Sequence, residues 1–374
     1  MPFALWLFFR TWDSIWALIA AQVLPVNSNG AVFYQEVPRI KGGLDFLWIP
    51  WQRWDTGWYM NIANQGYSVH DLSAAFFPFY PLLIRLVEPL LADNGVAAAV
   101  LIASVAALIS LVLFYQLAVS ELGEQGAERA LLYLVTFPTA FFLFAGYTES
   151  LFLALMLGAF LCARRQYWGW AGLVGGLSGL VRPQGMLMLL PLGIEFWLQY
   201  RRGQVNWKGA LNLLPVVIGG FAFWTYLGIL SGDWLAGLQV QVWWRHSTLP
   251  WDALGQALRM ILDMNASTER FFGVPDFVIG LLFLGLLLLS VFRLSPTWTS
   301  VIVIIVLPPL FGVTINNPYL PLSSLSRYVL VAFPAFLLLG RFLTNRVLRG
   351  LFVCLSLLLQ TLWLMLFASF MFVG

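Results

Sequence analysis

Charged side chains are scarce in this chain. Only 10% of its 374 residues are Asp, Glu, Lys or Arg, whereas 60% are hydrophobic. Soluble domains carry about a quarter charged residues, so this chain has too few to cover a surface that faces water. The composition therefore excludes a soluble globular protein and predicts an integral membrane protein. The 18 tryptophans agree with this, because indole rings favour the membrane–water boundary.

Cysteine and histidine are almost absent. Cys162 and Cys354 both lie in long apolar runs, so they are expected to be buried apolar residues rather than a disulfide or a metal pair. His70 and His246 stand alone, without the spacing of metal ligands. The sequence therefore predicts no metal site and no cofactor. A net charge of only +3, spread along the chain, likewise gives no indication of nucleic-acid binding.

Long apolar runs fill most of the sequence. A helix needs about 20 apolar residues to cross about 30 Å of hydrocarbon, and no repeat or soluble domain is visible. We therefore expect an all-α polytopic membrane protein, a single domain over residues 1–374 with about 11 transmembrane helices. The expected spans are 4–24, 95–118, 128–144, 148–163, 167–181, 184–200, 209–230, 273–292, 297–313, 327–342 and 350–372. The segment 76–92 is either a further span or a re-entrant piece.

Basic residues in the short connections predict the orientation. Alternation of the spans puts four such connections on one face, which the positive-inside rule makes cytoplasmic. They carry Arg164, Arg165, Arg201, Arg202, Lys208, Arg293, Arg341, Arg346 and Arg349. The outer face then holds two long connections, about 25–94, with interfacial helices, and 231–272. Segments this long are usually functional. Asp55, Glu149, Arg182 and Arg327 come from separate parts of the chain, and all are expected on this outer face.

The polar segment RWDTGWYMNIANQGY follows the first apolar run. Trp54, Trp58 and Ile62 recur every four residues, which predicts a short amphipathic helix in the membrane interface. Asp55 has two interpretations. It is a helix-start residue stabilised by the helix dipole, or it is a general base whose basicity is raised by partial desolvation at the bilayer surface.

Two arginines are expected at the outer ends of spans. Arg182 ends the glycine-rich run GLVGGLSGLVRPQG, where Pro183 stops or kinks the helix. Arg327 lies in SLSRY. Either side chain alone could extend to the lipid headgroups. A pair on one face also suits a phosphate ester with a lipid tail, because guanidinium groups bind phosphate through two hydrogen bonds.

Three other charged residues have structural and functional interpretations. Glu149 in AGYTES could cap the following helix, or it could orient sugar hydroxyls or an arginine. Arg10 and Asp13 are three residues apart within the first span, which favours a mutually satisfied intramembrane ion pair.

At this point five segments, taken in order, resemble a known family. They are RWDTGWYMNIANQGY, AFFPFYP, YTESLFL, GLVRPQG and SLSRYVLVAFP, which run from Arg53 to Pro334. Together they resemble the PIG-V family, the second mannosyltransferase of GPI-anchor assembly, which has prokaryotic relatives and belongs to the GT-C glycosyltransferases. RWD followed by WY, IA, GY and AFFP is the most specific part. The others gain weight from their order.

The resemblance implies an enzyme whose active site lies on the outer face. The donor would be a polyprenyl-phosphate hexose, typically mannose, transferred with inversion to a lipid or glycan acceptor among the membrane lipids. The acid in the first outer loop, which is Asp55 here, would be the base. The motifs would place Glu149, Arg182 and Arg327 around the substrate. The expected substrate-binding set is completed by Arg53, Trp54, Tyr59, Gln184 and Tyr328.

This chain departs from the eukaryotic members of that family in two respects. They have a polar residue and Asn where this chain has Pro183 and Gln184, and they are considerably longer. Two lysines against 18 arginines, together with the short loops, indicate a prokaryotic protein. We therefore expect a prokaryotic plasma membrane, or the endoplasmic reticulum membrane in a eukaryotic host.

Two other functions remain open on the sequence alone. A non-catalytic protein that binds or flips a polyprenyl-phosphate lipid would use the same arginines but would not need Asp55. A transporter predicts paired broken helices in two similar halves, and no such symmetry is visible. The transferase differs from both because it requires the carboxylate.

Overall fold

The computed structural model describes residues 1–27, 38–68, 71–237, 239–240, 245–263, 267–314 and 321–373, and His70 lies outside them. Within these residues, five helical segments are long and apolar enough to cross a membrane, as expected of an integral membrane protein. They are α1 (Pro2–Val23), α4 (Gly95–Val135), Trp207–Ser231, Gly273–Arg293 and α15 (Arg346–Ala368). The mostly helical fold is thereby confirmed, but the number of eleven spans is not.

Helices occur close to each expected span, yet many are shorter than the sequence pattern suggests. The run 184–200, for example, is divided between a 3-10 segment and a helix that begins at Leu189. The expected span 95–118 lies within α4, and the span 128–144 begins in the last part of α4, beyond Gly123, whose φ of +71° interrupts the helical backbone. The segment 76–92 contains only the nine-residue α3 (Phe79–Val87), which is too short to span a bilayer at about 1.5 Å per residue.

Contacts between residues divide the chain into two compact units. Unit 1 comprises Met1–Tyr67, Phe76–Gly158 and Leu339–Val373, and unit 2 comprises Ser68–Ala75 and Ala159–Leu338. Each unit is described separately below. The organisation as a single domain stays a prediction.

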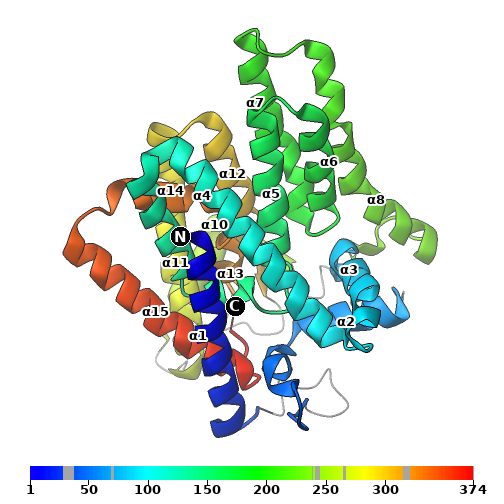
Figure 1. Ribbon diagram of the computed structural model, residues 1–374, viewed down its shortest axis with the longest axis vertical. Coiled ribbons are helices and arrows are strands. Elements are labelled where there is room, and N and C mark those ends of the chain that lie inside the picture. Colours follow the sequence, from blue (N-terminus) through cyan, green and yellow to red (C-terminus); the bar gives the residue numbers. More distant parts are fainter. Residues whose placement is uncertain are drawn as a thin grey trace. The chain divides into compact units, whose positions relative to one another are not determined.

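Unit 1 contains the long first connection and the helices that support it. In this unit α1 packs against both α4 and α15, and α2 (Asp55–Gln65) packs on α3, which packs on α4 (Figure 1). Tyr59, Tyr80 and Ala99 belong to the core where α2, α3 and α4 meet. The shorter elements are η1 (Asp45–Leu47), η2 (Ile49–Trp51), η4 (Glu88–Leu91), η5 (Ala140–Leu143) and the start of α5 (Glu149–Arg164).

Arg10 and Asp13 do not form the mutually satisfied ion pair that their spacing favours. The Arg10 guanidinium donates to the carbonyl of Phe144 at 3.2 Å and lies 5.2 Å from the centre of the Trp51 ring. Asp13 is fully buried, and neither carboxylate oxygen has a hydrogen-bond partner among the described residues. A backbone carbonyl and an indole face therefore replace the acid as the partners of Arg10.

Unit 2 is helical apart from one small sheet in its described part. β1 (Arg245–Ser247) pairs antiparallel with β2 (Gly312–Thr314), and His246 faces Val313 in the register. The helical elements are η3 (Ser73–Ala75), α6 (Trp168–Gly179), η6 (Pro183–Met188), α7 (Leu189–Arg201), η7 (Trp207–Leu213), α8 (Leu214–Ser231), α10 (Pro250–Leu262), α11 (Ser267–Arg293), α12 (Pro296–Val306), η8 (Pro308–Phe311), α13 (Leu325–Val329) and α14 (Phe333–Phe342).

Glycines allow α6 to pack closely against η7 and α8 (Figure 1). A Cβ atom on Gly172 would lie 1.6 Å from the backbone oxygen of Asn212, and one on Gly176 would lie 2.4 Å from that of Pro215. These distances are shorter than any real contact, and the atoms they meet are backbone. Small residues at such interfaces let helix backbones approach within a membrane, so the glycine-rich composition of α6 is a packing requirement.

This packing generates a first prediction. Gly172→Ala should lower the free energy of unfolding by about 1–3 kcal/mol, because the added methyl group forces backbone apart. Thermal unfolding of the purified protein in detergent measures the change. Gly193→Ala is the matched control, since a Cβ at Gly193 in α7 meets no atom within 4 Å. Equal melting temperatures for both variants would contradict the packing argument.

Candidate functional site

The segment before Asp55 is fixed by a buried arginine. Arg53 is 2% exposed. Its guanidinium donates to the carbonyls of Ala368 and Ile49, both at 2.8 Å, and to that of Gln52 at 2.9 Å. It also lies 4.2 Å from the centre of the Phe370 ring. Arg53 was predicted to bind substrate, but these contacts hold the backbone of its own loop against the end of α15.

Asp55 is the first residue of α2 and is partly exposed. The predicted helix in this segment is confirmed, and Asp55 occupies the helix-start position of the simpler interpretation, where the dipole favours a carboxylate. Trp54, immediately before it, has φ +48° and ψ −113°. A bulky residue with positive φ is an outlier, and such strain costs about 1–3 kcal/mol and persists only where the surroundings enforce it.

Contacts with Phe372 and Tyr147 hold Trp54 in this conformation. The Trp54 ring packs edge-on against Phe372, with centroids 5.2 Å apart. The backbone N–H of Asp55 donates to the Tyr147 hydroxyl at 3.3 Å, and that hydroxyl lies 3.4 Å from the carbonyl of Arg53. The carboxylate of Asp55 therefore stands on a helix start that is held from both sides.

The turn before α5 packs directly on this helix start. The Thr56 hydroxyl lies within hydrogen-bond distance of the carbonyls of Trp51 and Gly146, at 3.2 and 3.3 Å. A Cβ on Gly146 would lie 2.8 Å from the Thr56 methyl carbon, so this close approach requires glycine. The motifs RWDT and AGYTES, 90 residues apart in the chain, thus meet in unit 1.

Glu149 and Tyr59 belong to the same unit. Glu149, the first residue of α5, is 1% exposed. Tyr59 is buried in α2, with its ring 5.0 Å from that of Tyr80. The Tyr80 hydroxyl donates to the carbonyl of Ala99 at 2.8 Å. Burial raises the pKa of Tyr80 well above its ordinary value, and Tyr59 and Glu149 raise it further, so Tyr80 stays a neutral hydrogen-bond donor.

Two of the predicted arginines converge in unit 2. Arg182 lies between α6 and η6, where its backbone N–H donates to the carbonyl of Ser178 at 3.2 Å. Arg327 lies in α13. Both are buried, at 8% and 7% exposure. Their guanidinium carbons lie 5.5 and 5.3 Å from the centre of the Tyr328 ring. The structure therefore brings Arg182 and Arg327 to the same aromatic ring, that of Tyr328, and their role around a substrate stays a prediction.

A third arginine, which the sequence analysis missed, completes this group. The Arg245 guanidinium lies 5.3 Å from the centre of the same Tyr328 ring. It donates to the carbonyl of Pro309 at 3.1 Å and to that of Ser323. Its position in the second long outer connection was a usable signal, because Arg182 and Arg327 were predicted on that same face. We call Arg182, Arg245, Arg327 and Tyr328 the arginine cluster.

The helix that carries Arg327 is itself anchored. The Asp276 carboxylate accepts from the backbone N–H of Ser326 at 2.8 Å. Ser324, which precedes α13, has φ +70°. Gln184 follows Arg182 by two residues in η6, is partly buried, and its amide oxygen has no hydrogen-bond partner among the described residues. The described residues contain no group of three or more His, Cys, Asp and Glu side chains that could hold a metal ion.

The contacts of Arg53 generate a second prediction. Arg53→Leu should lower the free energy of unfolding by at least about 1.5–3 kcal/mol, because buried carbonyls lose charge-assisted hydrogen bonds. Arg39→Leu is the matched control, since Arg39 is exposed in the same connection. Thermal unfolding in detergent compares the two. A stable Arg53→Leu protein that lost only donor affinity would instead support the substrate-binding interpretation.

Residues 43–195 match the family model described as mannosyltransferase (PIG-V). The GPI alpha-1,6-mannosyltransferase 2 of Rattus norvegicus is 34% identical over 169 residues, and that of Mus musculus is 33% identical over 171 residues. Each match covers 41% of this chain and 32% of the relative. The chain therefore matches about a third of the length of these curated relatives.

Among solved structures, this chain is similar to an oligosaccharyltransferase of Archaeoglobus fulgidus, crystallised with Zn and sulfate. The alignment covers 98% of this chain and 53% of the oligosaccharyltransferase chain. Its TM-score is 0.43 and its sequence identity 15%, which is too low a likeness to indicate a shared fold. The matched segment 43–195 includes Asp55, Glu149 and Arg182. The predicted resemblance to the PIG-V mannosyltransferase family is therefore confirmed over residues 43–195 of this chain.

Proposed function

We propose that this protein is an integral-membrane glycosyltransferase that transfers a hexose, mannose in the first instance, from a polyprenyl-phosphate sugar to a lipid or glycan acceptor on the non-cytoplasmic face. The observation that carries the proposal is the position of Asp55. It lies in the segment that matches the mannosyltransferase family, on a helix start held by a strained residue and a buried arginine.

Asp55 is the general base in this proposal. Its carboxylate accepts the proton of the acceptor hydroxyl while that oxygen forms the new bond to the anomeric carbon, and the bond from this carbon to the phosphate oxygen breaks. A base in position contributes about 10²- to 10⁴-fold to such a step. One displacement inverts the anomeric carbon, so no second carboxylate is needed as a nucleophile. The fixed helix start supports this role because catalysis depends on orientation.

The arginine cluster binds the phosphate of the donor. Guanidinium groups pair with phosphate oxygens through charge-assisted hydrogen bonds, and in a site of low dielectric they stabilise the negative charge that grows on a leaving phosphate. Arg182 and Arg327 are both buried beside one aromatic ring. An exposed arginine that only extends to lipid headgroups would not need this burial, so the phosphate interpretation is favoured.

The chemistry of the outer face explains the class of donor. Nucleotide sugars are made in the cytoplasm, so an enzyme that works on the other side of a membrane needs its activated sugar on a lipid. The leaving group is then a lipid phosphate. The active-site face, the donor and the prokaryotic plasma membrane stay proposals, and the name of the curated relatives supports the choice of mannose.

Asp55→Asn tests the proposal against its main alternative, a protein that only binds or flips a polyprenyl-phosphate lipid. The amide keeps the shape of the side chain but cannot accept a proton. We expect turnover to fall by about 10²-fold or more, while binding of polyprenyl-phosphate mannose persists. The assay uses purified protein in detergent with candidate acceptors, and mass spectrometry detects the product.

Glu88→Gln is the matched control, because this partly exposed acid lies in η4 of the same unit. An Asp55→Asn protein with normal turnover would show that the carboxylate is not the base. A wild-type protein that binds or moves the lipid but never forms product would favour the non-catalytic alternative.

The arginine cluster generates a separate prediction. Arg182→Ala and Arg327→Ala should each weaken donor binding by about 1.5–3 kcal/mol if the side chains meet phosphate, and Arg245→Ala should weaken it in the same direction. Binding is measured with polyprenyl phosphate, with and without the sugar. Arg259→Ala is the control, because Arg259 is exposed in α10 of the same unit. Unchanged affinity in the Arg182 and Arg327 double variant would return both residues to the headgroup interpretation.

A further inference from the structure

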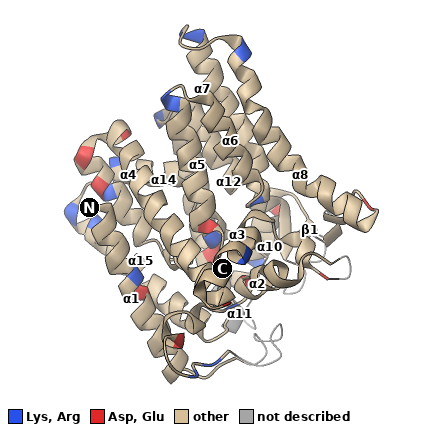
Figure 2. Cartoon of the chain, turned by 45° about the vertical axis from the view of Figure 1, so that its right-hand side comes forward, with Lys and Arg blue, Asp and Glu red and all other residues tan. Residues whose placement is uncertain are grey.

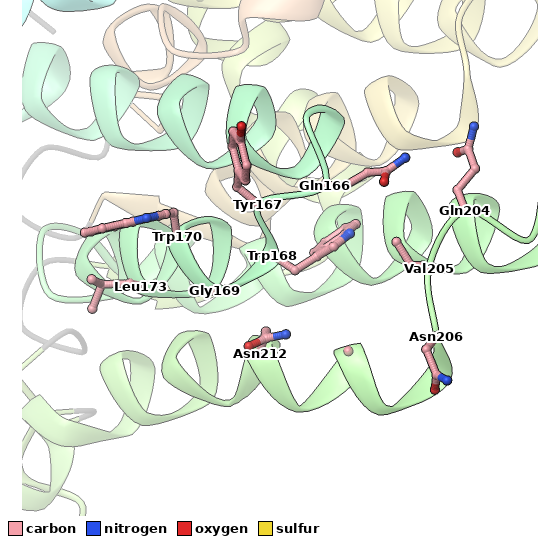
Figure 3. A pocket seen from close by; sticks show the side chains of 11 residues that line it. Gln166, Tyr167, Trp168, Gly169, Trp170, Leu173, Gln204, Val205, Asn206 and Asn212 are labelled. Atoms are coloured by element: carbon pink, nitrogen blue, oxygen red, sulfur yellow. The ribbon is translucent and has the colours of Figure 1, made fainter.

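A groove of about 670 Å³ lies in unit 2, and no residue of the arginine cluster lines it (Figure 3). It is formed by the connection from α5 to α6, the start of α6, the connection from α7 to η7, and η7 itself. Four amide side chains line it, together with indole rings: Gln166, Gln204, Asn206, Asn212, Trp168 and Trp170. Amides donate and accept hydrogen bonds, so this lining suits a ligand that carries hydroxyl or phosphate oxygens.

The lining changes character along the groove. Figure 3 shows Trp170 and Leu173 at one end, and Gln204 and Asn206 at the other. Trp170 and Leu173 are 63% and 46% exposed, so the apolar end is open to its surroundings. Gln204 and Asn206 at the polar end are exposed as well. An open groove with a polar end and an apolar end fits an amphiphile whose head lies among the amides and whose tail lies along Trp170 and Leu173.

The walls of the groove are fixed by packing. The Trp168 indole N–H donates to the side-chain oxygen of Gln199 at 3.2 Å, and its ring packs edge-on against Phe196 at 5.0 Å. Asn206 accepts from the backbone N–H of Lys208 at 3.0 Å. The close approach of Gly172 to the Asn212 backbone fixes α6 against η7. The groove is thus formed without a ligand.

The two connections that form the groove carry charge of one sign. Arg164 and Arg165 immediately precede Gln166, Arg201 and Arg202 precede Gln204, and Lys208 follows Asn206. Neither the stretch 161–173 nor the stretch 200–213 contains an acid. In Figure 2, Lys and Arg gather at the end of this unit at which α5 and α7 end. Arg164 lies 4.7 Å from the centre of the Trp298 ring, and the Glu195 carboxylate accepts from the Gln199 amide behind Trp168. The two connections themselves carry five cations and no acid, which favours a negatively charged ligand.

We propose that this groove is a binding site for an anionic phospholipid, with the phosphate and the polar headgroup among the amides and the acyl chains leaving past Trp170 and Leu173. The basic connections predict that this face is cytoplasmic, where anionic lipids attract clustered Lys and Arg. The site is distinct in residues from the arginine cluster, and its occupation does not depend on the proposed transferase activity.

Lipid binding to the full-length protein in detergent tests this assignment. Native mass spectrometry gives the affinity for phosphatidylglycerol and for phosphatidylcholine with the same acyl chains. We expect phosphatidylglycerol to bind at least about tenfold more tightly, which corresponds to one or two of the five cations.

The first variant fills the groove. Gly169 lines it, and a Cβ there would meet only the Asn212 side-chain oxygen, at 3.8 Å. Gly169→Leu should therefore lower phosphatidylglycerol affinity about tenfold, whereas Gly193→Leu, at a glycine with no atom near its Cβ position, should leave it unchanged. The second variant, Arg165→Gln with Arg202→Gln and Lys208→Gln, changes exposed side chains and should remove the preference for the anionic lipid. It keeps the test decisive if Gly169→Leu fails to fold.

Three results would overturn the proposal. The two lipids could bind with equal affinity, or both variants could retain the wild-type preference. Polyprenyl phosphate could also displace phosphatidylglycerol at equal concentration, which would assign the groove to the isoprenoid lipid instead. Transferase turnover, measured in parallel, separates these results from a failure of the proposed function, because neither variant changes a residue of the proposed site.

Discussion

A guanidinium group buried in a chain this apolar needs hydrogen-bond partners, and the Arg53 side chain donates to backbone carbonyls of its own loop and of the end of α15. Removing a charge from water costs several kcal/mol unless hydrogen bonds and neighbouring groups replace the solvent. Here the replacements are the carbonyls of Ile49 and Ala368 and the face of Phe370. The same contacts fix the loop that ends in Trp54, whose unusual backbone conformation is held by Phe372 and Tyr147. The direction in which α2 starts, and therefore where Asp55 stands, follows from this one satisfied charge.

The arginine cluster of unit 2 meets the same constraint in a different way. Its three guanidinium groups share one aromatic ring, and cations over an aromatic face are attracted by the ring's quadrupole. Arg245 also bonds to backbone carbonyls, which ties the β1–β2 pair to the segment before α13. Like charges so close together repel one another, so the aromatic ring and the backbone carbonyls help to hold them in place.

Much of this could be predicted from sequence because the signals are local. The helix after Trp54 and the break at Pro183 follow from periodicity and proline chemistry. Arg182 and Arg327 lie far apart in the chain, and the orientation rule that assigns them to one face stays a prediction. The structural role of Arg53 could not be predicted, because two of its partners, Ala368 and Phe370, lie more than 300 residues away at the end of the chain. The predicted ion pair between Arg10 and Asp13 was wrong for a different reason. A spacing of three residues allows an ion pair on a helix but does not require one. The groove at Gly169 left no pattern in the sequence, because it is formed by two connections that only folding brings together.

The base function of Asp55 is the central claim, and chemical rescue tests it most directly. Asp55→Ala removes the carboxylate, and added formate can occupy the space and accept the proton in its place. We expect this variant to be inactive alone and to regain turnover with rising formate concentration. Formate should not change the turnover of the wild-type protein. An Asp55→Ala protein that turns over at the wild-type rate without formate would contradict the account, because the transfer would then need no carboxylate at this position.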